Sequence, residues 1–189
     1  MAERIYAKAE LIDKYLKRLV SKKIEHIGTG TEQMAFQHPT LPNVVVKLMG
    51  RRAGFGEWAM LCHKNQSNPY LPKIYSINAV KLRHDPKGED RNHLLIFTEK
   101  LESLSLYSDP EIEQTFGTPL FVWLTKQTKP AQTKVFKSFL ARVKDRKLRE
   151  AIGLAAFKQP STCAFDISLD NVMLRGSTPV INDPWIRIF

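Results

Sequence analysis

The segment from Ala164 to Trp185 constrains the fold more than any other part of this 189-residue sequence. Asp166 stands five positions before Asn171, and Asn171 runs directly into the apolar run Val172–Leu174. A turn and a second apolar run then lead to Asp183. If the two runs form a hairpin, these carboxylate and amide oxygens come together, and such oxygens are the ligands that Mg²⁺ prefers. The spacing predicts a magnesium site, whereas the alternative is that each aspartate only stabilises a turn.

A second candidate site lies near the start of the chain. Gly28 and Gly30 fall in a predicted hairpin, where backbone N–H groups can approach phosphate oxygens that side chains would otherwise block. Lys47 follows three valines in a predicted buried strand. A buried lysine is costly unless an anion meets it. Each feature also has a plainer explanation, a β-turn for the glycines and a sheet edge for the lysine, but together they indicate an anion site.

Hydrophobic periodicity predicts an α+β fold, in which an antiparallel sheet carrying one helix precedes a helical half. The predicted helices cover residues 2–20, 56–66, 109–125, 131–143 and 145–157, and the predicted strands cover 24–27, 34–36, 44–49, 73–80, 93–98, 172–174 and 179–181. The expected division is an N-terminal amphipathic helix at 1–20, a sheet-rich part at 21–101 and a second part at 102–189.

Positive charge is concentrated between Lys126 and Arg149. The chain has 29 Lys and Arg against 19 Asp and Glu, and this tract alone holds nine basic residues and one acid. Such a field attracts acidic protein surfaces. Apolar residues recur at helical spacing within the tract, so the solvated face of an amphipathic helix is the alternative explanation. The aromatic-interleaved strands of RNA-binding sheets are missing from the pattern, which disfavours nucleic acid as a partner.

The composition disfavours a disulfide framework, a zinc site and a membrane span. Cys62 and Cys163 are 101 positions apart, which fits a reducing compartment. The five histidines show no pair at metal-ligand spacing. The longest apolar runs are too short to cross a bilayer. We therefore expect a cytoplasmic protein.

The order of these motifs, G-x-G, V-V-K, E, D-x-x-x-x-N and D-P-W, resembles the protein-kinase-like superfamily, with D-P-W where a metal-binding D-F-G is usual. More narrowly, residues 38–47, 165–173 and 181–184 look like the early serine/threonine kinases of short-tailed bacteriophages. The resemblance spans about residues 24–185. It implies a two-lobed fold with a five-stranded antiparallel N-terminal lobe bearing one helix, and a minimal, truncated helical C-terminal lobe.

The resemblance also implies how a nucleotide would be held. Gly28 and Gly30 would cover the phosphates of ATP with backbone amides. Lys47 would contact the α- and β-phosphates while Glu57, on the helix of the first lobe, holds it in place. The backbone of the hinge would bond the adenine edge, and this hinge comprises Thr98, Glu99 and Leu101 with the residue between them.

The same resemblance implies the chemistry. Asn171 and Asp183 would hold Mg²⁺, and Asp166 would orient the attacking hydroxyl and accept its proton. The expected activity is ATP- and Mg²⁺-dependent phosphotransfer, most closely that of a serine/threonine protein kinase acting on host proteins in the host cytoplasm during phage infection. The basic tract would then favour acidic partner surfaces.

Four departures from the kinase pattern keep two other functions open. Gln33 replaces the third loop glycine, Ala164-Phe165 replace a His-Arg pair, Ser168 replaces a basic residue, and the sequence stops four residues after Trp185. The sequence after Trp185 is too short to form the helical platform on which protein kinases bind a peptide, and this would suit a small-molecule kinase. Gln33 and Ser168 would suit a pseudokinase that binds a partner and transfers nothing.

The apolar C-terminal tail suggests a further contact. Its large apolar residues are Trp185, Ile186, Ile188 and Phe189. This tail would pair with a partner or with a second copy of the chain, or else it folds onto the chain's own core.

Overall fold

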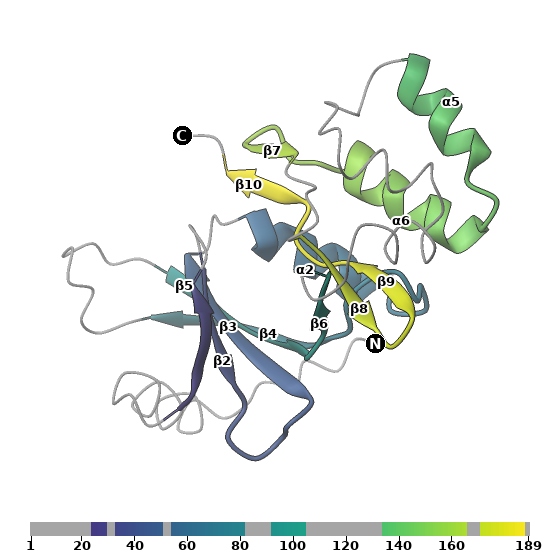
Figure 1. Ribbon diagram of the computed structural model, residues 1–189. Helices are drawn as coiled ribbons and strands as arrows, with labels where there is room; N and C mark the ends of the chain where they lie inside the picture. The colour runs from purple at the N-terminus through teal and green to yellow at the C-terminus, as the bar shows by residue number, and fades with distance from the viewer. Residues whose placement is uncertain are drawn as a thin grey trace.

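The computed structural model describes residues 24–29, 33–50, 54–81, 92–104, 134–165 and 171–187 (Figure 1). Its N-terminal part is an antiparallel sheet of five strands in the order β1-β2-β3-β5-β4. The strands are β1 (His26–Thr29), β2 (Gln33–Gln37), β3 (Val44–Gly50), β4 (Ile74–Lys81) and β5 (Asn92–Glu99). Helix α2 (Gly54–Lys64) packs on β4 and β5. This arrangement confirms the predicted protein-kinase-like α+β fold.

Strand β3 is covered on both faces, which explains its run of valines. Side chains alternate across a strand. Val46 and Leu48 therefore face one apolar cluster, together with Leu95 of β5. Met49 faces the other cluster, which contains the inner side of α2. Lys47 shares the face of Met49, so the lysine points toward the helix.

The second part contains two helices and two small sheets. The helices are α5 (Lys134–Arg142) and α6 (Arg146–Phe157). One sheet has the order β6-β8-β9, with β6 (Glu102–Ser103), β8 (Val172–Arg175) and β9 (Thr178–Ile181), and the other pairs β7 (Cys163–Phe165) with β10 (Trp185–Arg187). In Figure 1 the α5–α6 pair lies at the far end from the five-stranded sheet, with α2 and β8–β10 between them.

Two of the three helices predicted beyond α2 are confirmed, because α5 and α6 fall within the predicted ranges 131–143 and 145–157. The predicted helices at 2–20 and 109–125 lie outside the described residues. The described helices are too short or too polar to cross a membrane.

Two tryptophans join the sheet-rich part to the second part. The rings of Trp58 in α2 and Trp185 in β10 meet edge to face, with centroids 5.1 Å apart. The Trp58 indole N–H donates to the carbonyl of Ile181 at 3.1 Å, and the Trp185 indole N–H donates to the carbonyl of Ala155 at 2.7 Å. Each buried ring therefore has a partner for its polar atom, and Trp58 is a core residue.

The start of α2 lies unusually close to β10. A Cβ atom at Gly54 would stand 2.4 Å from the carbonyl oxygen of Trp185, a separation that no side chain tolerates. Trp185 itself is only 3% exposed. This residue of the apolar tail thus folds onto the chain's own core, while association through the rest of the tail stays a prediction.

Candidate active site

The β8–β9 hairpin brings Asn171 and Asp183 together. Val172 pairs with Ile181, and the turn between the strands passes through Gly176, whose φ of 57° favours glycine. Beyond the last pair, the amides of Asn182 and Asp183 donate to the carbonyl oxygen of Asn171, at 2.9 and 3.2 Å. The two candidate metal ligands are therefore neighbours in space, although eleven residues separate them in the chain.

Lys47 is buried beside this hairpin. It is 7% exposed, and its ammonium nitrogen lies 3.6 Å from the centroid of the Phe55 ring. Burial lowers the pKa of Lys47 to about 8, while the negative charge of Asp183 acts in the opposite direction. The charge of Asp183 thus acts on the buried Lys47, although the two residues are 136 positions apart in the chain.

The structure does not place Glu57 beside Lys47, so the expected ion pair is not formed. Glu57 is exposed, and none of the ion pairs in the described part of the chain joins it to the lysine. Helical geometry gives the reason. Phe55 and Cys62 are seven residues apart and share the inner face of α2, whereas Glu57 is rotated by about 200° from Phe55.

The inner face of α2 offers Lys47 an aromatic ring and a thiol in place of a carboxylate. Cys62 is fully buried, and this burial raises the pKa of its thiol well above the usual value, an effect that Lys47 opposes. The thiol is therefore neutral at ordinary pH. Cation–π attraction to Phe55 and the negative charge of Asp183 both stabilise the Lys47 ammonium.

Gln33 is a site residue whose role was not predicted. It begins β2, and its side-chain amide nitrogen donates to the carboxylate oxygen Oδ2 of Asp183 at 2.6 Å. Its own Oε1 is buried and accepts no hydrogen bond from the residues that the structure describes. The only signal in the sequence was the position of Gln33, where the third glycine of a nucleotide-binding loop would stand.

The expected hinge is tied into the fold by its side chains. Thr98 donates its hydroxyl to the carbonyl of Lys73 at 3.0 Å. Glu99 is 8% exposed and accepts the backbone amide of Lys73 at 2.7 Å. Its carboxylate also accepts hydrogen bonds from Nε and Nη2 of Arg175, the first at 2.7 Å. The side chains of Thr98 and Glu99 thus hold the hinge in place rather than facing a ligand.

The hinge backbone leaves one amide for a ligand. The amide of Glu99 donates to the carbonyl of Lys73, and that of Lys100 donates to the carbonyl of Asn43. Leu101 lies between β5 and β6, and among the described residues no hydrogen bond uses its amide. If the hinge bonds an adenine edge, Leu101 is the residue whose N–H can do so.

Gly28 lies within β1, and a Cβ atom there would meet nothing within 4 Å. The surface over this glycine is therefore open. Gly30 and Asp166 lie outside the described residues. Phe165, which directly precedes Asp166 in the sequence, pairs with Trp185 in the β7–β10 ladder. That pairing fixes the chain just before Asp166 against the chain just after Asp183.

The donor set suits a magnesium–phosphate complex better than a metal held by protein alone. Within the described ranges no cluster of three His, Cys, Asp or Glu residues is positioned to hold a metal ion. One carboxylate and one amide leave most of an octahedral shell to water and phosphate oxygens, as is common for Mg²⁺. A buried ammonium beside them supplies the positive charge that a polyphosphate needs.

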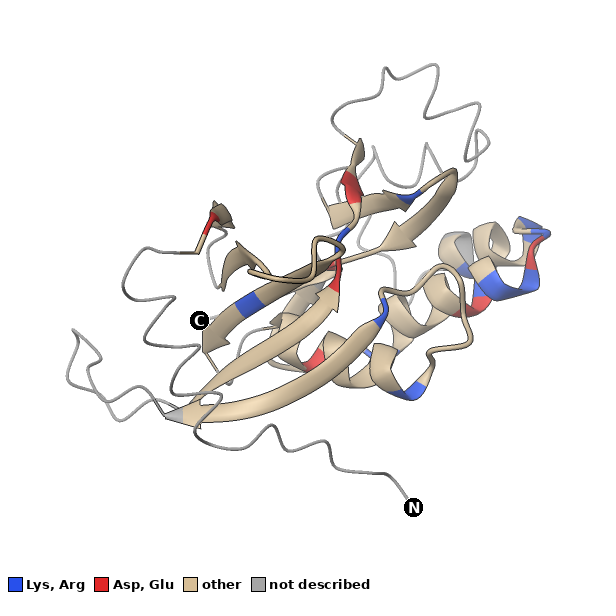
Figure 2. Ribbon diagram, turned by 90° about the horizontal axis from the view of Figure 1, so that it is seen from below, with Lys and Arg blue, Asp and Glu red and all other residues tan. Residues whose placement is uncertain are grey.

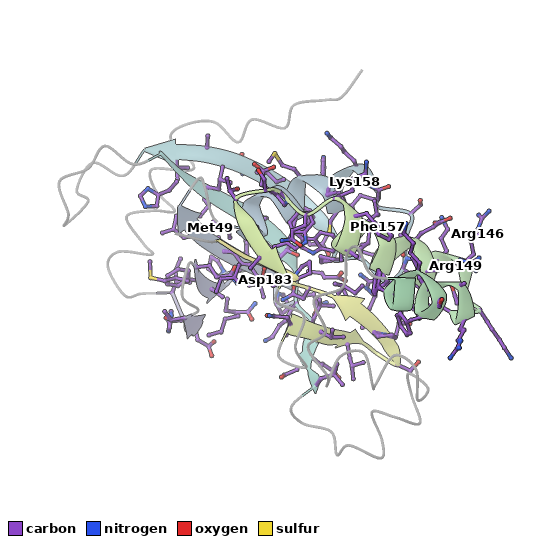
Figure 3. All side chains as sticks on the ribbon, turned by 90° about the horizontal axis from the view of Figure 1, so that it is seen from above. Met49, Arg146, Arg149, Phe157, Lys158 and Asp183 are labelled. Carbon is purple, nitrogen blue, oxygen red and sulfur yellow. The ribbon has the colours of Figure 1, made fainter. Side chains whose placement is uncertain are left out.

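The described part of the basic tract forms the outer surface of α5 and α6, where Lys and Arg gather in Figure 2. Phe136 and Val143 are buried, so the amphipathic explanation holds for this part of the tract. Glu150 pairs with both Arg146 and Lys147 at 3.5 Å and offsets part of the charge. Arg146 and Arg149 project at the end of the molecule that α5 and α6 form, away from the centrally placed Asp183 (Figure 3).

No protein-family model matches this sequence, and no curated protein is similar to it by sequence. Solved structures with similarity include aminoglycoside phosphotransferase APH(4)-Ia, at 13% identity and a TM-score of 0.44, over 93% of this chain and 71% of that one. A second is the streptomycin–ATP–APH(2")-IIa ternary complex, at 12% identity and a TM-score of 0.38, over 95% and 72%. The kinase-like fold of this chain is evident from its own strand order and from the position of α2.

Proposed function

We propose that this protein is an ATP- and Mg²⁺-dependent phosphotransferase. The observation that carries the proposal is the buried Lys47 beside Asp183, which the β8–β9 hairpin holds against Asn171. A buried ammonium with a lowered pKa is destabilising until an anion reaches it. The triphosphate of ATP would supply that anion, and its metal would find its protein ligands in the same place.

Each residue then has a definite task. Lys47 binds phosphate oxygens, Asn171 and Asp183 hold Mg²⁺, and the Leu101 amide bonds the adenine edge. When bound, Mg²⁺ supplies neutralisation of the negative charge on the transferred phosphoryl group. Asp166, which lies outside the described residues, accepts the proton of the acceptor hydroxyl. Positioning and charge stabilisation are the main requirements of phosphoryl transfer.

The proposed acceptor is a serine or threonine hydroxyl of a protein, with host proteins as the targets if the gene is of phage origin. This part of the proposal is supported by the motif resemblance and by the basic surface of α5 and α6. Acidic protein surfaces are the partners that such a surface would attract.

The direct test incubates the purified protein with Mg²⁺ and γ-labelled ATP, alone, with host lysate, and with small alcohols and amines. Label on protein supports the proposal. Label on small molecules alone would assign a small-molecule kinase instead. Nucleotide binding without any transfer would identify a pseudokinase, and absence of nucleotide binding would refute the proposed function altogether.

Two substitutions connect transfer to the proposed residues. Asp183→Asn should abolish transfer because a metal ligand loses its charge, and Asp166→Ala should lower it by about 10²-fold or more. Asp145→Asn is the matched control, because it makes the same chemical change at the start of α6, outside the site. Transfer at the wild-type rate in Asp183→Asn would remove Asp183 from the metal site.

A further inference from the structure

Gln33 makes a contact that a glycine at the same position could not make. Its amide nitrogen reaches Asp183, 150 positions away, and donates to Oδ2 at 2.6 Å. The contact is partly buried, and the acceptor is a residue proposed above as a metal ligand. A hydrogen bond to a charged carboxylate is stronger than one between neutral groups. The bond therefore stabilises the carboxylate in its metal-free arrangement.

The register of the sheet shows why Gln33 reaches the site. Gln33 pairs with Met49 across β2 and β3, and Ala35 pairs with Lys47. Directly paired residues point to the same face of a sheet. Gln33, Met49 and Lys47 consequently share the face that looks toward Asp183. Figure 3 shows Met49 and Asp183 in the same part of the molecule. The geometry is thus a property of the β2–β3 ladder rather than of an unsupported loop.

The amide and a metal ion compete for the same oxygen. The Gln33 N–H directs a positive partial charge at Oδ2 and occupies one of its two lone pairs, so a divalent cation at that oxygen is opposed by this charge and has only the other lone pair free of it. The hydrogen bond would therefore have to weaken or break for the cation to have full use of Oδ2.

We propose that Gln33 is a latch that holds the Asp183 carboxylate in the empty site and sets the affinity for the Mg²⁺–nucleotide complex. The proposal rests on the proposed function, since it assigns Asp183 to the metal. Gln33 is a positioning residue, because it acts through Asp183. The latch acts only on metal-dependent binding, whereas binding of a nucleotide without metal does not require Oδ2.

The test measures ADP binding by calorimetry, with Mg²⁺ and with EDTA, in the wild type, Gln33→Ala and Gln33→Met. Methionine keeps the length of the side chain but removes the donor. Both variants should bind Mg²⁺–ADP about tenfold more tightly than the wild type, the order expected for a lost hydrogen bond to a charged group. Affinity in EDTA should not change. Gln37→Ala is the control, because Gln37 lies on the same strand as Gln33 but its side chain donates to the carbonyls of Pro42 and Val44, away from Asp183.

The outcomes separate the latch from the proposed function. Unchanged or weaker Mg²⁺–ADP binding in both Gln33 variants, with binding intact in the wild type, would overturn the latch alone. Tighter binding in Gln33→Ala but not in Gln33→Met would show that bulk, not the hydrogen bond, is responsible, and would also overturn it. If no variant binds Mg²⁺–ADP, the proposed function and the latch fall together.

A double-mutant cycle tests the latch without any ligand. The melting temperatures of Gln33→Ala, Asp183→Asn and the double variant should be non-additive, since the two side chains share a bond. Additive shifts in the ligand-free protein would contradict the contact itself.

Discussion

The Lys47 side chain shows the conflict between stability and function at the scale of one residue. Its ammonium is buried among Phe55, Cys62 and the hairpin, and its pKa falls to about 8 because burial outweighs the attraction of Asp183. The charged form is therefore kept at a cost to folding. Sites that bind anions commonly retain such destabilising groups, because the ligand removes the penalty when it binds.

Lys47→Met should be at least as stable as the wild type, with a free energy of unfolding unchanged or raised by about 1 kcal/mol. Methionine fills a similar volume without a charge. The same variant should lose the rise in melting temperature that ATP gives the wild type. Urea denaturation and nucleotide-dependent thermal shifts measure the two effects. A strongly destabilised Lys47→Met that still binds ATP would mean that the lysine is structural.

At the scale of elements, the start of α6 is fixed by one aspartate. Asp145 accepts the amide of Leu148 at 2.9 Å and the hydroxyl of Tyr70 at 2.7 Å. It thus serves as the N-cap of α6 and ties the helix to the segment that follows α2. Both hydrogen bonds lower the pKa of the Asp145 carboxyl, that of Leu148 most. This lowering predicts a defined dependence of stability on pH.

Asp145→Ala should lose about 1 kcal/mol of stability at pH 7, the usual cost of removing an N-cap. Because the pKa of Asp145 is lower in the folded than in the unfolded protein, the stabilisation by the carboxylate is complete above the usual pKa of 3.8 and is lost as the pH falls through the folded pKa. The difference between the wild type and Asp145→Ala should thus shrink below about pH 3.8. Urea denaturation at a series of pH values measures it.

Asp145→Asn provides the matched comparison. Asparagine is also a good N-cap, because its Oδ1 can accept the amide of Leu148 while its amide nitrogen donates to the hydroxyl oxygen of Tyr70, but it does not titrate. Its stability should stay near that of the wild type at pH 7. An unchanged difference between the wild type and Asp145→Ala across the acid range would contradict the role of the charge.

At the scale of the whole molecule, local sequence patterns predicted the strands and turns that they encode, but they did not predict features that depend on tertiary packing. The valine run before Lys47 and the turn at Gly176 are local signals, and both predicted the elements that place Lys47 and Asp183. Glu57 was assigned from a motif rather than from its phase on the helix, and the phase turns it outward. Strands β6, β7 and β10 have two or three residues each, too few for a periodic signal.

Side-chain contacts between segments far apart in the chain are the main structural feature that the sequence did not predict. Gln33 meets Asp183 across 150 positions, and Glu99 meets Arg175 across 76. Either partner taken alone looks like an ordinary polar residue near a turn. Only the joint packing of the sheet, α2 and the hairpin gives them a partner, so no spacing rule could have identified them.

Arg175 is the residue through which the hinge and the hairpin are joined. Besides Glu99, it donates to the carbonyls of Pro69 at 2.7 Å and Leu71 at 3.0 Å. It lies at the end of β8, and Asn171 directly precedes the same strand. One guanidinium therefore connects the end of β5, the segment after α2 and the hairpin that carries the candidate metal ligands. Arg is suited to this because its donors are planar and fixed.

Arg175→Ala should lower the free energy of unfolding by about 2–3 kcal/mol, because the nearly buried Glu99 carboxylate loses charge-assisted hydrogen bonds. Affinity for Mg²⁺–nucleotide should fall as well, since the hairpin loses its anchor to the hinge. The double variant Glu99→Leu with Arg175→Met should recover most of the stability, because neither partner is left unpaired. Urea denaturation and calorimetry measure these effects. If Arg175→Ala is as stable as the wild type, the hydrogen bonds of Arg175 contribute nothing to the junction between the two parts.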